Sequence, residues 1–296
     1  MIEYYEYKNN KIIKFRYILI IILVILIMLL ISFIVAVTFA HNQKREVEKH
    51  ENENIMIIEL EDKIKKKEEE ERQRILQQEK EEEQNATGVI YLTFDDGPSS
   101  DSTPQILDIL KRNNIKATFF VLHYSEENSE LIKREQNEGH TIALHGYTHT
   151  YSDIYYSADA CIENFRKIQN QVYETTGIKS NIIRFPGGSS NTVSRRYSQG
   201  VMTELTKRVI DEGFRYFDWN ADSTDAARPK SSDTVYENTI SALEPGRNNV
   251  VLMHDFHGNH KTIDALQDVI NYGLENGYVF RKITEETPMV THSVNN

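Results

Sequence analysis

The sequence has almost no cysteine and a deficit of basic residues. Its one cysteine, Cys161, excludes an intramolecular disulfide and leaves the redox compartment undecided, and we expect it to be a small core residue on a helix. Lys and Arg number 34 against 45 Asp and Glu, which gives a formal net charge of -11. Because phosphate binding needs a basic face, this composition argues against a nucleic-acid partner.

One stretch, Tyr17 to Ala40, contains no charged residue and is predominantly apolar. About 24 residues at roughly 1.5 Å each can cross a hydrocarbon layer of about 30 Å. A cleavable signal peptide is the alternative, but its apolar region is typically only about 7 to 15 residues long. The sequence therefore predicts one transmembrane helix, residues 17–40, that acts as an uncleaved signal anchor.

The basic residues around this stretch set its expected orientation. Those before it are Lys8, Lys11, Lys14 and Arg16, and those soon after it are Lys44, Arg45 and Lys49. The balance slightly favours a cytoplasmic N-terminus, residues 1–16, and a long C-terminal domain can translocate whatever the flanking charge. We expect a single-pass protein of the cell membrane with its larger part outside the cytoplasm.

Residues 41–86 form a charged spacer. Glu68 and Arg72 stand four apart, as do Glu70 and Arg74, which is the spacing of pairs on a solvated helix. Ile57, Leu60 and Ile64 fit one heptad seam, but the next seam positions are charged, so a sustained coiled coil is not supported. The spacer is either helical or a disordered linker, and self-association through it is left open.

From Val89 onward, short apolar runs alternate with amphipathic stretches, which indicates an α/β fold with a parallel sheet. The expected strands are 89–94, 117–122, 141–145, 182–185, 214–218, 250–253 and 278–282. The expected helices are 104–112, with Thr103 as N-cap, then 130–137, 158–176, 203–212, 234–243 and 262–276. Seven such units predict a barrel rather than an open sheet, covering residues 87–288, with a frayed tail at 289–296.

Polar side chains collect where the predicted strands end. Barrel active sites are built from the loops at the carboxyl ends of strands, so these side chains are expected on one rim. They are Asp95 and Asp96 after the first strand, His145 and His149 after the third, Arg184 at the fourth, Asp218, Asp222 and Asp225 after the fifth, and His254 and Asp255 after the sixth.

The pair of imidazoles predicts a metal site. His145 and His149 are four residues apart, so both can point the same way if the segment takes a helical turn. With Asp96 they would form a two-His, one-carboxylate site that leaves a position for water, as in catalytic zinc sites, although the same triad suits non-haem iron. Adjacent residues of an extended chain point opposite ways, so one carboxylate of Asp95-Asp96 can hold the metal while the other acts as a base.

Two more segments supply groups for catalysis. Arg184 could orient Asp95 through a charge-assisted pair, and Gly187 and Gly188 could present backbone N–H groups to an oxyanion; the alternative is a tight turn with a surface arginine. His254 ends an apolar run, so it should have restricted motion, which suits a general acid. A carboxylate, for which Asp225 is the candidate, could raise its pKa.

Five short motifs follow one another along the chain: Thr93-Phe94-Asp95-Asp96-Gly97-Pro98, His145-Gly146-Tyr147-Thr148-His149, Arg184-Phe185-Pro186-Gly187-Gly188, Asp222-Ser223-Thr224-Asp225 and Leu252-Met253-His254. In this order they resemble the motifs of the NodB-like polysaccharide deacetylases, the carbohydrate esterase family four, over residues 88–283. The resemblance implies a distorted (β/α) barrel, a divalent metal that is usually Zn²⁺, with Co²⁺, Mn²⁺ or Fe²⁺ as alternatives, and removal of N-acetyl groups from amino-sugar polymers.

The resemblance also implies a role for each motif residue. The metal ligands would be Asp96, His145 and His149; the base would be Asp95, supported by Arg184; the acid would be His254, tuned by Asp225; and the groups facing the substrate and the oxyanion would be Pro186, Gly187 and Leu252. The family often has an aromatic residue directly after the second Asp of its fourth motif, where this chain has Ala226. One wall of the sugar groove would then be open, and Trp219 could compensate.

Together with the anchor and the spacer, the resemblance implies a hydrolase that deacetylates cell-wall peptidoglycan by cleaving carbon–nitrogen bonds other than peptide bonds. Its partners would be an N-acetylated glycan and the membrane. Rival functions on the same site are an O-acetyl polysaccharide esterase and a chitooligosaccharide deacetylase. A rival of another class is a non-catalytic, wall-binding membrane protein, but the intact acid, base and metal ligands argue against it.

Overall fold

The computed structural model describes residues 2–295, with side chains from residue 15 onward. The chain divides into two compact units, Met1–Gln78 and Glu79–Asn296. In the described residues the first unit is entirely helical, and every strand belongs to the second.

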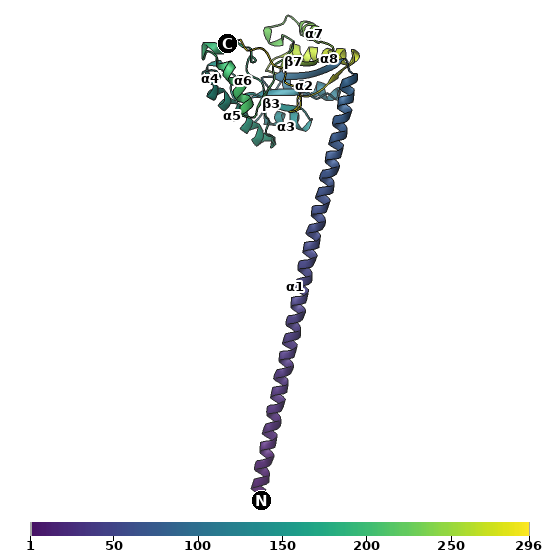
Figure 1. Cartoon of the computed structure of the whole chain (residues 1–296), viewed down its shortest axis with the longest axis vertical. Helices are drawn as coiled ribbons and strands as arrows, with labels where there is room; N and C mark the ends of the chain where they lie inside the picture. Colours follow the sequence, from purple (N-terminus) through teal and green to yellow (C-terminus); the bar gives the residue numbers. More distant parts are fainter. Residues whose placement is uncertain (1, 296) are drawn as a thin grey trace. The chain divides into compact units, whose positions relative to one another are not determined.

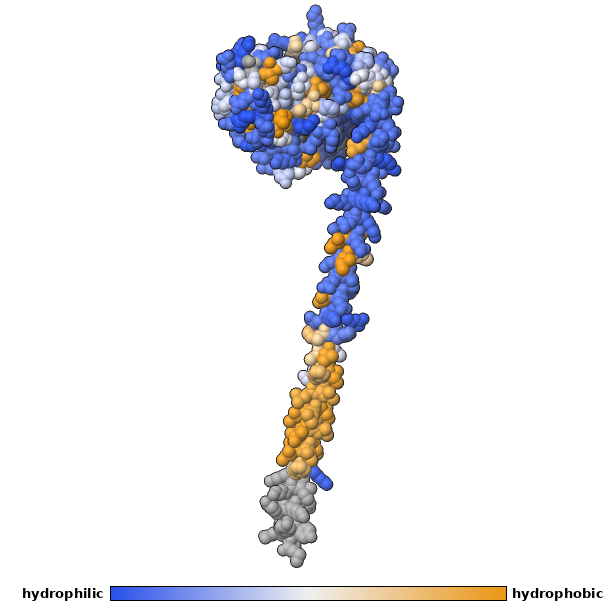
Figure 2. All heavy atoms as spheres, in the orientation of Figure 1, coloured by the Kyte–Doolittle hydropathy of each residue, from blue (hydrophilic) through white to orange (hydrophobic). Residues whose placement is uncertain are grey.

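Helix α1 (Ile2–Asn85) contains the predicted membrane span. It is long and apolar enough to cross a membrane, properties that a signal sequence near an N-terminus shares. Figure 2 shows this part of the helix as an orange stretch followed by a blue, hydrophilic one. The spacer residues 41–85 are helical, and Ile57, Leu60 and Ile64 are exposed.

The second unit is built on a parallel sheet in which β1 is central (Figure 1). Its strands are β1 (Gly88–Asp95), β2 (Thr118–Leu122), β3 (Thr141–Gly146), β4 (Ile182–Ile183), β5 (Arg215–Tyr216), β6 (Ala221–Asp222), β7 (Asn248–His254) and β8 (Tyr278–Phe280). The order is β5-β4-β3-β2-β1-β7-β6, and β8 also pairs with β1. Each predicted strand is present, and the two-residue strand β6 is an addition to them.

The sheet curls, as expected of a distorted barrel. Its two end strands, β5 and β6, are consecutive along the chain and separated only by residues 217–220, so the ends of the sheet approach each other. In the described part of the chain no pairing joins these strands. The C-terminal tail lies beside this connection, because the Asp218 N–H donates to Val290 O at 2.8 Å. The prediction of a frayed tail was therefore wrong.

Helices surround the sheet in an order that follows the strands. They are α2 (Ser102–Arg112), α3 (Ser129–Asn137), α4 (Tyr151–Ile154), α5 (Ala158–Thr176), α6 (Val201–Asp211), α7 (Ser232–Ser241) and α8 (His260–Glu275), with short 3₁₀ turns η1 (Ser194–Arg196) and η2 (Asp225–Ala227). Contacts link them in the order α7, α8, α2, α3, α5 and α6. The predicted helices are all present, and α4 is new.

One predicted cap was wrong. Helix α2 begins at Ser102, and Asp101 is its N-cap, because the Asp101 carboxylate accepts from the Ser102 N–H at 2.9 Å. Thr103 lies inside the helix, where its hydroxyl donates to Asp255 Oδ2 at 2.6 Å. The helix starts earlier than the first proline suggests because proline is tolerated throughout a first turn.

Strand β1 is buried on both faces, as a central parallel strand must be. Ile90, Leu92 and Phe94 point toward the helices and join the large apolar core. Val89 and Tyr91 belong to a smaller cluster on the opposite, interior face of the curled sheet. The alternation places Asp95 in the same interior series as Tyr91. Cys161 is buried on α5, as predicted.

Candidate active site

The predicted site residues come together at one rim because the strands that carry them are parallel. Asp95 is the last residue of β1, and His254 is the last residue of β7. The two are register partners, like Thr93 and Leu252 beneath them. His145 lies in β3, one residue before its end, and Arg184 directly follows β4.

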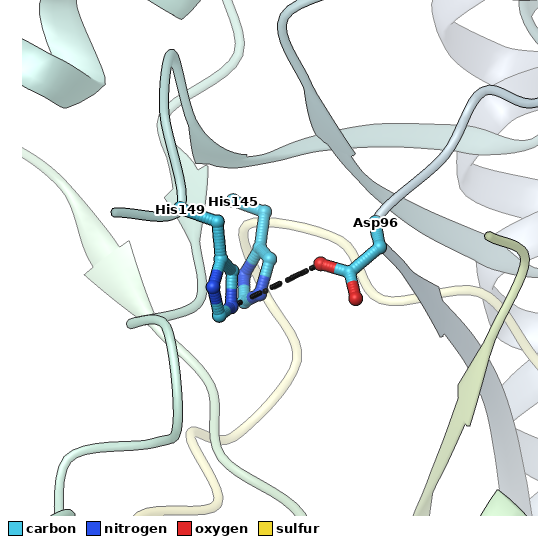
Figure 3. Close-up of side chains that lie close together, drawn as sticks. All are labelled: Asp96, His145 and His149. Carbon is cyan, nitrogen blue, oxygen red and sulfur yellow. Dashed lines mark ion pairs between the residues drawn. The ribbon is translucent and has the colours of Figure 1, made fainter. Parts of the chain in front are cut away.

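Asp96, His145 and His149 form a candidate metal centre (Figure 3). Their ligand atoms all lie within 4.8 Å of one another. The Asp96 Oδ1 atom is 3.6 Å from His145 Nε2 and 3.9 Å from His149 Nε2, and the two imidazoles lie side by side facing the carboxylate. This oxygen is buried and has no hydrogen-bond partner among the described residues. A buried, unpartnered carboxylate oxygen that faces two imidazole nitrogens fits a divalent cation.

The backbone after β1 aims the Asp96 carboxylate. Asp96 has φ +76°, in the left-handed region that Asp tolerates better than most residues with a side chain. Its N–H donates to Phe120 O at 3.3 Å, and Gly97 O accepts from Leu122 N at 2.9 Å, so the turn is bonded to β2. The change from extended Asp95 to left-handed Asp96 separates the two carboxylates.

The two histidines face the same carboxylate, as their spacing allowed, but they do so without the helical turn on which that interpretation was conditional. Residues 147–150 form a loop before α4, and Gly146 within β3 has φ +138°. Asn164 of α5 holds this loop: its Oδ1 accepts from Thr148 N at 2.9 Å, and its Nδ2 donates to Thr148 O at 3.1 Å. A side chain at Gly146 would collide with Asn164 Nδ2. Packing of α5 against the loop, rather than helical spacing, aligns the imidazoles.

The surroundings of both imidazoles suit metal binding. His145 Nδ1 is 3.0 Å from Arg184 O, and because a carbonyl only accepts, Nδ1 is the donor, which in the neutral ring leaves the lone pair on Nε2. Burial lowers the pKa of His149, and the neighbouring His145 lowers it further, against the opposing effect of Asp96. A neutral imidazole is the form that binds a metal.

Arg184 is fully buried, so the alternative of a surface arginine was wrong. Its Nη1 donates to Asp95 Oδ1 at 2.7 Å and to Thr93 Oγ1 at 2.8 Å. Its other nitrogens donate to the carbonyls of Phe217 and Asp218, at 2.9 and 3.1 Å. The other Asp95 oxygen, Oδ2, lies 3.8 Å from His145 Nε2. One Asp95 oxygen thus binds arginine while the other lies at the edge of the candidate metal centre.

His254 is bound twice by Asp225, which lies in η2. Its Nδ1 is 2.7 Å from Asp225 Oδ1, and its backbone N–H donates to Oδ2 at 2.8 Å. Thr262 and Asn259 also donate to that Oδ2, at 2.6 and 2.9 Å. Burial alone would lower the pKa of His254, but the hydrogen bond and charge of Asp225 outweigh it and raise that pKa to about 9. The imidazole is therefore protonated at neutral pH.

The remaining predicted residues have different surroundings. Gly187 has φ +75°, and the carbonyl of Pro186 accepts from Tyr155 Oη at 2.8 Å. Leu252 is buried in β7. Asp218 is buried, and its Oδ1 accepts a hydrogen bond from the Ser189 N–H at 2.8 Å. It therefore holds the loop that contains Gly187 and is not exposed on the rim.

The aromatic position of the fourth motif is open, since Ala226 is exposed on η2. Trp219 packs against the His292 ring, with centroids 4.8 Å apart, and its ring lies beside Gly188. That Trp219 forms the wall of the sugar groove in place of the missing aromatic residue stays a prediction.

Sequence reasoning missed four supporting side chains: Thr93, Asn164, Asn259 and Thr262. A weak signal existed for Asn164, a polar residue on the apolar face of the predicted helix 158–176. The others bond across more than 30 residues, Asn259 and Thr262 to Asp225 and Thr93 to Arg184, so local patterns do not reveal them.

Comparisons with known proteins agree with this geometry. The sequence pattern described as "Polysaccharide deacetylase" matches residues 82–202. A peptidoglycan-N-acetylglucosamine deacetylase of Bacillus cereus is 32% identical over 211 residues, covering 67% of this chain and 70% of that protein.

Two solved structures are also similar. The catalytic domain of a peptidoglycan N-acetylglucosamine deacetylase from Eubacterium rectale superposes with a TM-score of 0.67 at 42% identity, covering 70% of this chain and 94% of that one. A polysaccharide deacetylase from Bacillus cereus gives a TM-score of 0.60 at 29% identity, covering 69% and 95%.

Proposed function

This chain belongs to the polysaccharide deacetylase family, and from that premise we propose that it removes N-acetyl groups from amino sugars of cell-wall peptidoglycan and releases acetate. The observation that carries the proposal is the placement of three kinds of group on one rim. The metal triad, the Arg184–Asp95 pair and the Asp225–His254 pair provide a cation site, a base and an acid.

We propose Asp96, His145 and His149 as the metal ligands. A bound divalent cation, with Zn²⁺ favoured by the donor set, would polarise the acetamide carbonyl and lower the pKa of water. His145 Nδ1 is already engaged by the Arg184 carbonyl, which orients the ring for binding through Nε2. Co²⁺, Mn²⁺ and Fe²⁺ accept the same ligands, so metal analysis decides among them.

The reaction then needs one proton removed and one delivered. Asp95 Oδ2, on the side of the candidate metal centre, takes a proton from the attacking water while Oδ1 stays bonded to Arg184. His254, held protonated by Asp225, donates through its remaining nitrogen, Nε2, to the leaving amine. The Gly187 N–H donates to the oxyanion, and Pro186 and Leu252 line the place of the acetyl group.

The proposed substrate rests on the relatives and on the first unit. Two of the similar proteins are named peptidoglycan N-acetylglucosamine deacetylases. An apolar helix followed by a charged helical spacer would hold the domain, residues 87–288, outside the cytoplasm at the membrane, where peptidoglycan lies. Exposed Ile57, Leu60 and Ile64 are the residues through which two spacers could associate.

Acetate release tests the proposal. The full-length chain in detergent is incubated with purified peptidoglycan, with N-acetylated chitin oligomers and with O-acetylated glycan, each with and without a chelator. We expect acetate from peptidoglycan, lost with the chelator and restored by Zn²⁺. Release only from O-acetylated glycan would favour the esterase, and release from none would favour a wall-binding protein.

A further inference from the structure

Tyr151 is a half-buried side chain beside the candidate metal centre that the proposed mechanism does not use. It is the first residue of α4, two positions after His149. Its ring packs edge-on against the His149 ring, with centroids 5.5 Å apart and an interplanar angle of 74°. The ring of Tyr155 packs on it as well, at 5.5 Å. These contacts hold the Tyr151 ring in one place at the rim.

The Tyr151 hydroxyl lies directly against the backbone of Gly187. A Cβ atom at Gly187 would collide with this hydroxyl, so the oxygen fills the space that a side chain at position 187 would occupy. Gly187 also has φ +75°, where a side chain is strained. Two independent features of position 187 thus require glycine, and one of them is the approach of Tyr151.

This hydroxyl is a free donor. In the described part of the chain, no hydrogen bond involves Tyr151 Oη. Its neighbour Tyr155 differs, because it is fully buried and its hydroxyl donates to Pro186 O at 2.8 Å, which is a structural bond within the fold. A hydroxyl that is fixed by its ring contacts, half accessible and unbonded is suited to a ligand that arrives from outside.

We infer that Tyr151 is a catalytic residue whose hydroxyl donates a hydrogen bond to the oxyanion that develops on the acetyl carbonyl, together with the Gly187 N–H. The inference rests on the proposed function. The carbonyl oxygen gains negative charge as the tetrahedral intermediate forms, and a second preorganised donor lowers the energy of that state more than that of the neutral acetamide. No covalent bond of the phenol is broken.

The test is Tyr151→Phe in the full-length, metal-loaded chain, assayed with a soluble N-acetylated chitin oligomer. Removal of the hydroxyl alone keeps the ring contacts with His149 and Tyr155. Loss of one oxyanion donor lowers kcat by about 100-fold, with KM and metal content unchanged. Tyr156→Phe is the matched control, because that side chain lies five residues further on, is 61% exposed, and should leave kcat unchanged.

Each other outcome counts against the inference. An unchanged kcat in Tyr151→Phe overturns it, and so does a raised KM with normal kcat, which would mean a ground-state contact with the sugar. Loss of metal from the variant would assign Tyr151 to positioning His149 instead. If the wild-type chain releases no acetate from any glycan, the proposed function fails as well, whereas an active wild type with an equally active variant defeats only the role of Tyr151.

Discussion

Asp95 and His254 are register partners at the ends of the adjacent parallel strands β1 and β7. Side chains alternate between the two faces of a strand, so Asp95 lies on the same face as Tyr91, and His254 on the same face as Val250. Tyr91 and Val250 both belong to the interior cluster, so the carboxylate and the imidazole lie on the same face of the sheet. Each is then held by a partner from another element, Arg184 for the carboxylate and Asp225 for the imidazole. The groups proposed as base and acid therefore lie on neighbouring strands and on the same face of the sheet.

Asp95→Asn should separate catalysis from metal binding. The amide cannot accept a proton from water, so we expect turnover to fall by about 100- to 10,000-fold. The metal content should stay at the wild-type level, because Asp96, His145 and His149 are untouched. Acetate release and elemental analysis of the same preparation check both statements, and near-normal turnover would rule out Asp95 as the base. Asp96→Asn is the contrasting variant, since it should lose metal together with activity.

Activity should decline as the pH rises through the pKa of His254. That pKa is raised to about 9, mainly by the Asp225 hydrogen bond against the opposing effect of burial, so the acid form is present at neutral pH. Asp225→Asn removes the charge, and kcat/KM should then begin to fall at a lower pH. The groups that act on His254 are Asp225, Asp95 and Asp96. A pH profile of the variant that overlays the wild-type profile would contradict this pairing.

The same pair predicts how stability depends on pH. Because the pKa of His254 is higher in the folded chain than its ordinary value of about 6.5, its contribution to stability is complete below that value and is lost as the pH rises through about 9. Thermal unfolding at pH 6 and pH 10 measures the loss. In Asp225→Asn, the difference in thermal stability between pH 6 and pH 10 should be smaller than in the wild type. An equal difference in both proteins would mean that other groups cause the pH dependence.

Arg184→Met should destabilise the domain strongly. The substitution leaves the Asp95 carboxylate, which is 3% exposed, without its counter-charge. Breaking a buried pair by removing one partner costs about 3–5 kcal/mol of unfolding free energy. Denaturant unfolding measures it, with Arg195→Met, an exposed side chain, as the control expected to change little. A cost below about 1 kcal/mol would mean that water reaches Asp95.

Removal of residues 290–296 should weaken both stability and turnover. The truncation removes two hydrogen bonds of Asp218: the one that its N–H donates to Val290 O, and the one that its Oδ2 accepts from the His292 N–H at 2.7 Å. The carbonyl of Asp218 accepts from Arg184, so the disturbance reaches the arginine that holds Asp95. We expect a loss of about 1–3 kcal/mol per orphaned buried group.

The control for this truncation removes only residues 295–296, which leaves Val290 and His292 in place. Thermal unfolding and acetate release are compared for the two shortened chains. If the longer truncation matches the control in both measurements, the tail is only a surface segment.

The candidate site was largely predictable because its groups stand at the ends of strands, and strands are marked by local apolar runs. The runs 89–94 and 250–253 placed Asp95 and His254 at chain positions where a parallel sheet must bring ends together. The side chains that hold these groups in place were less predictable. The two imidazoles come together on a loop and not on a helical turn, because Gly146 has φ +138° and Asn164 of α5 binds the loop. Residue spacing does not reveal such side-chain hydrogen bonds.

The sequence by itself determined the alternation of strands and helices, the apolar helix and the order of the motifs, because each depends on residues close together in the chain. The tertiary structure decided what surrounds each group: the burial of Arg184, the two hydrogen bonds between His254 and Asp225, the docking of the tail on Asp218 and the approach of Tyr151 to Gly187. These contacts join residues 29 to 89 positions apart, with the tail bond at 74. The pairing of the strands and the curl of the sheet bring these residues within reach, because residues so far apart in the chain are not held together locally.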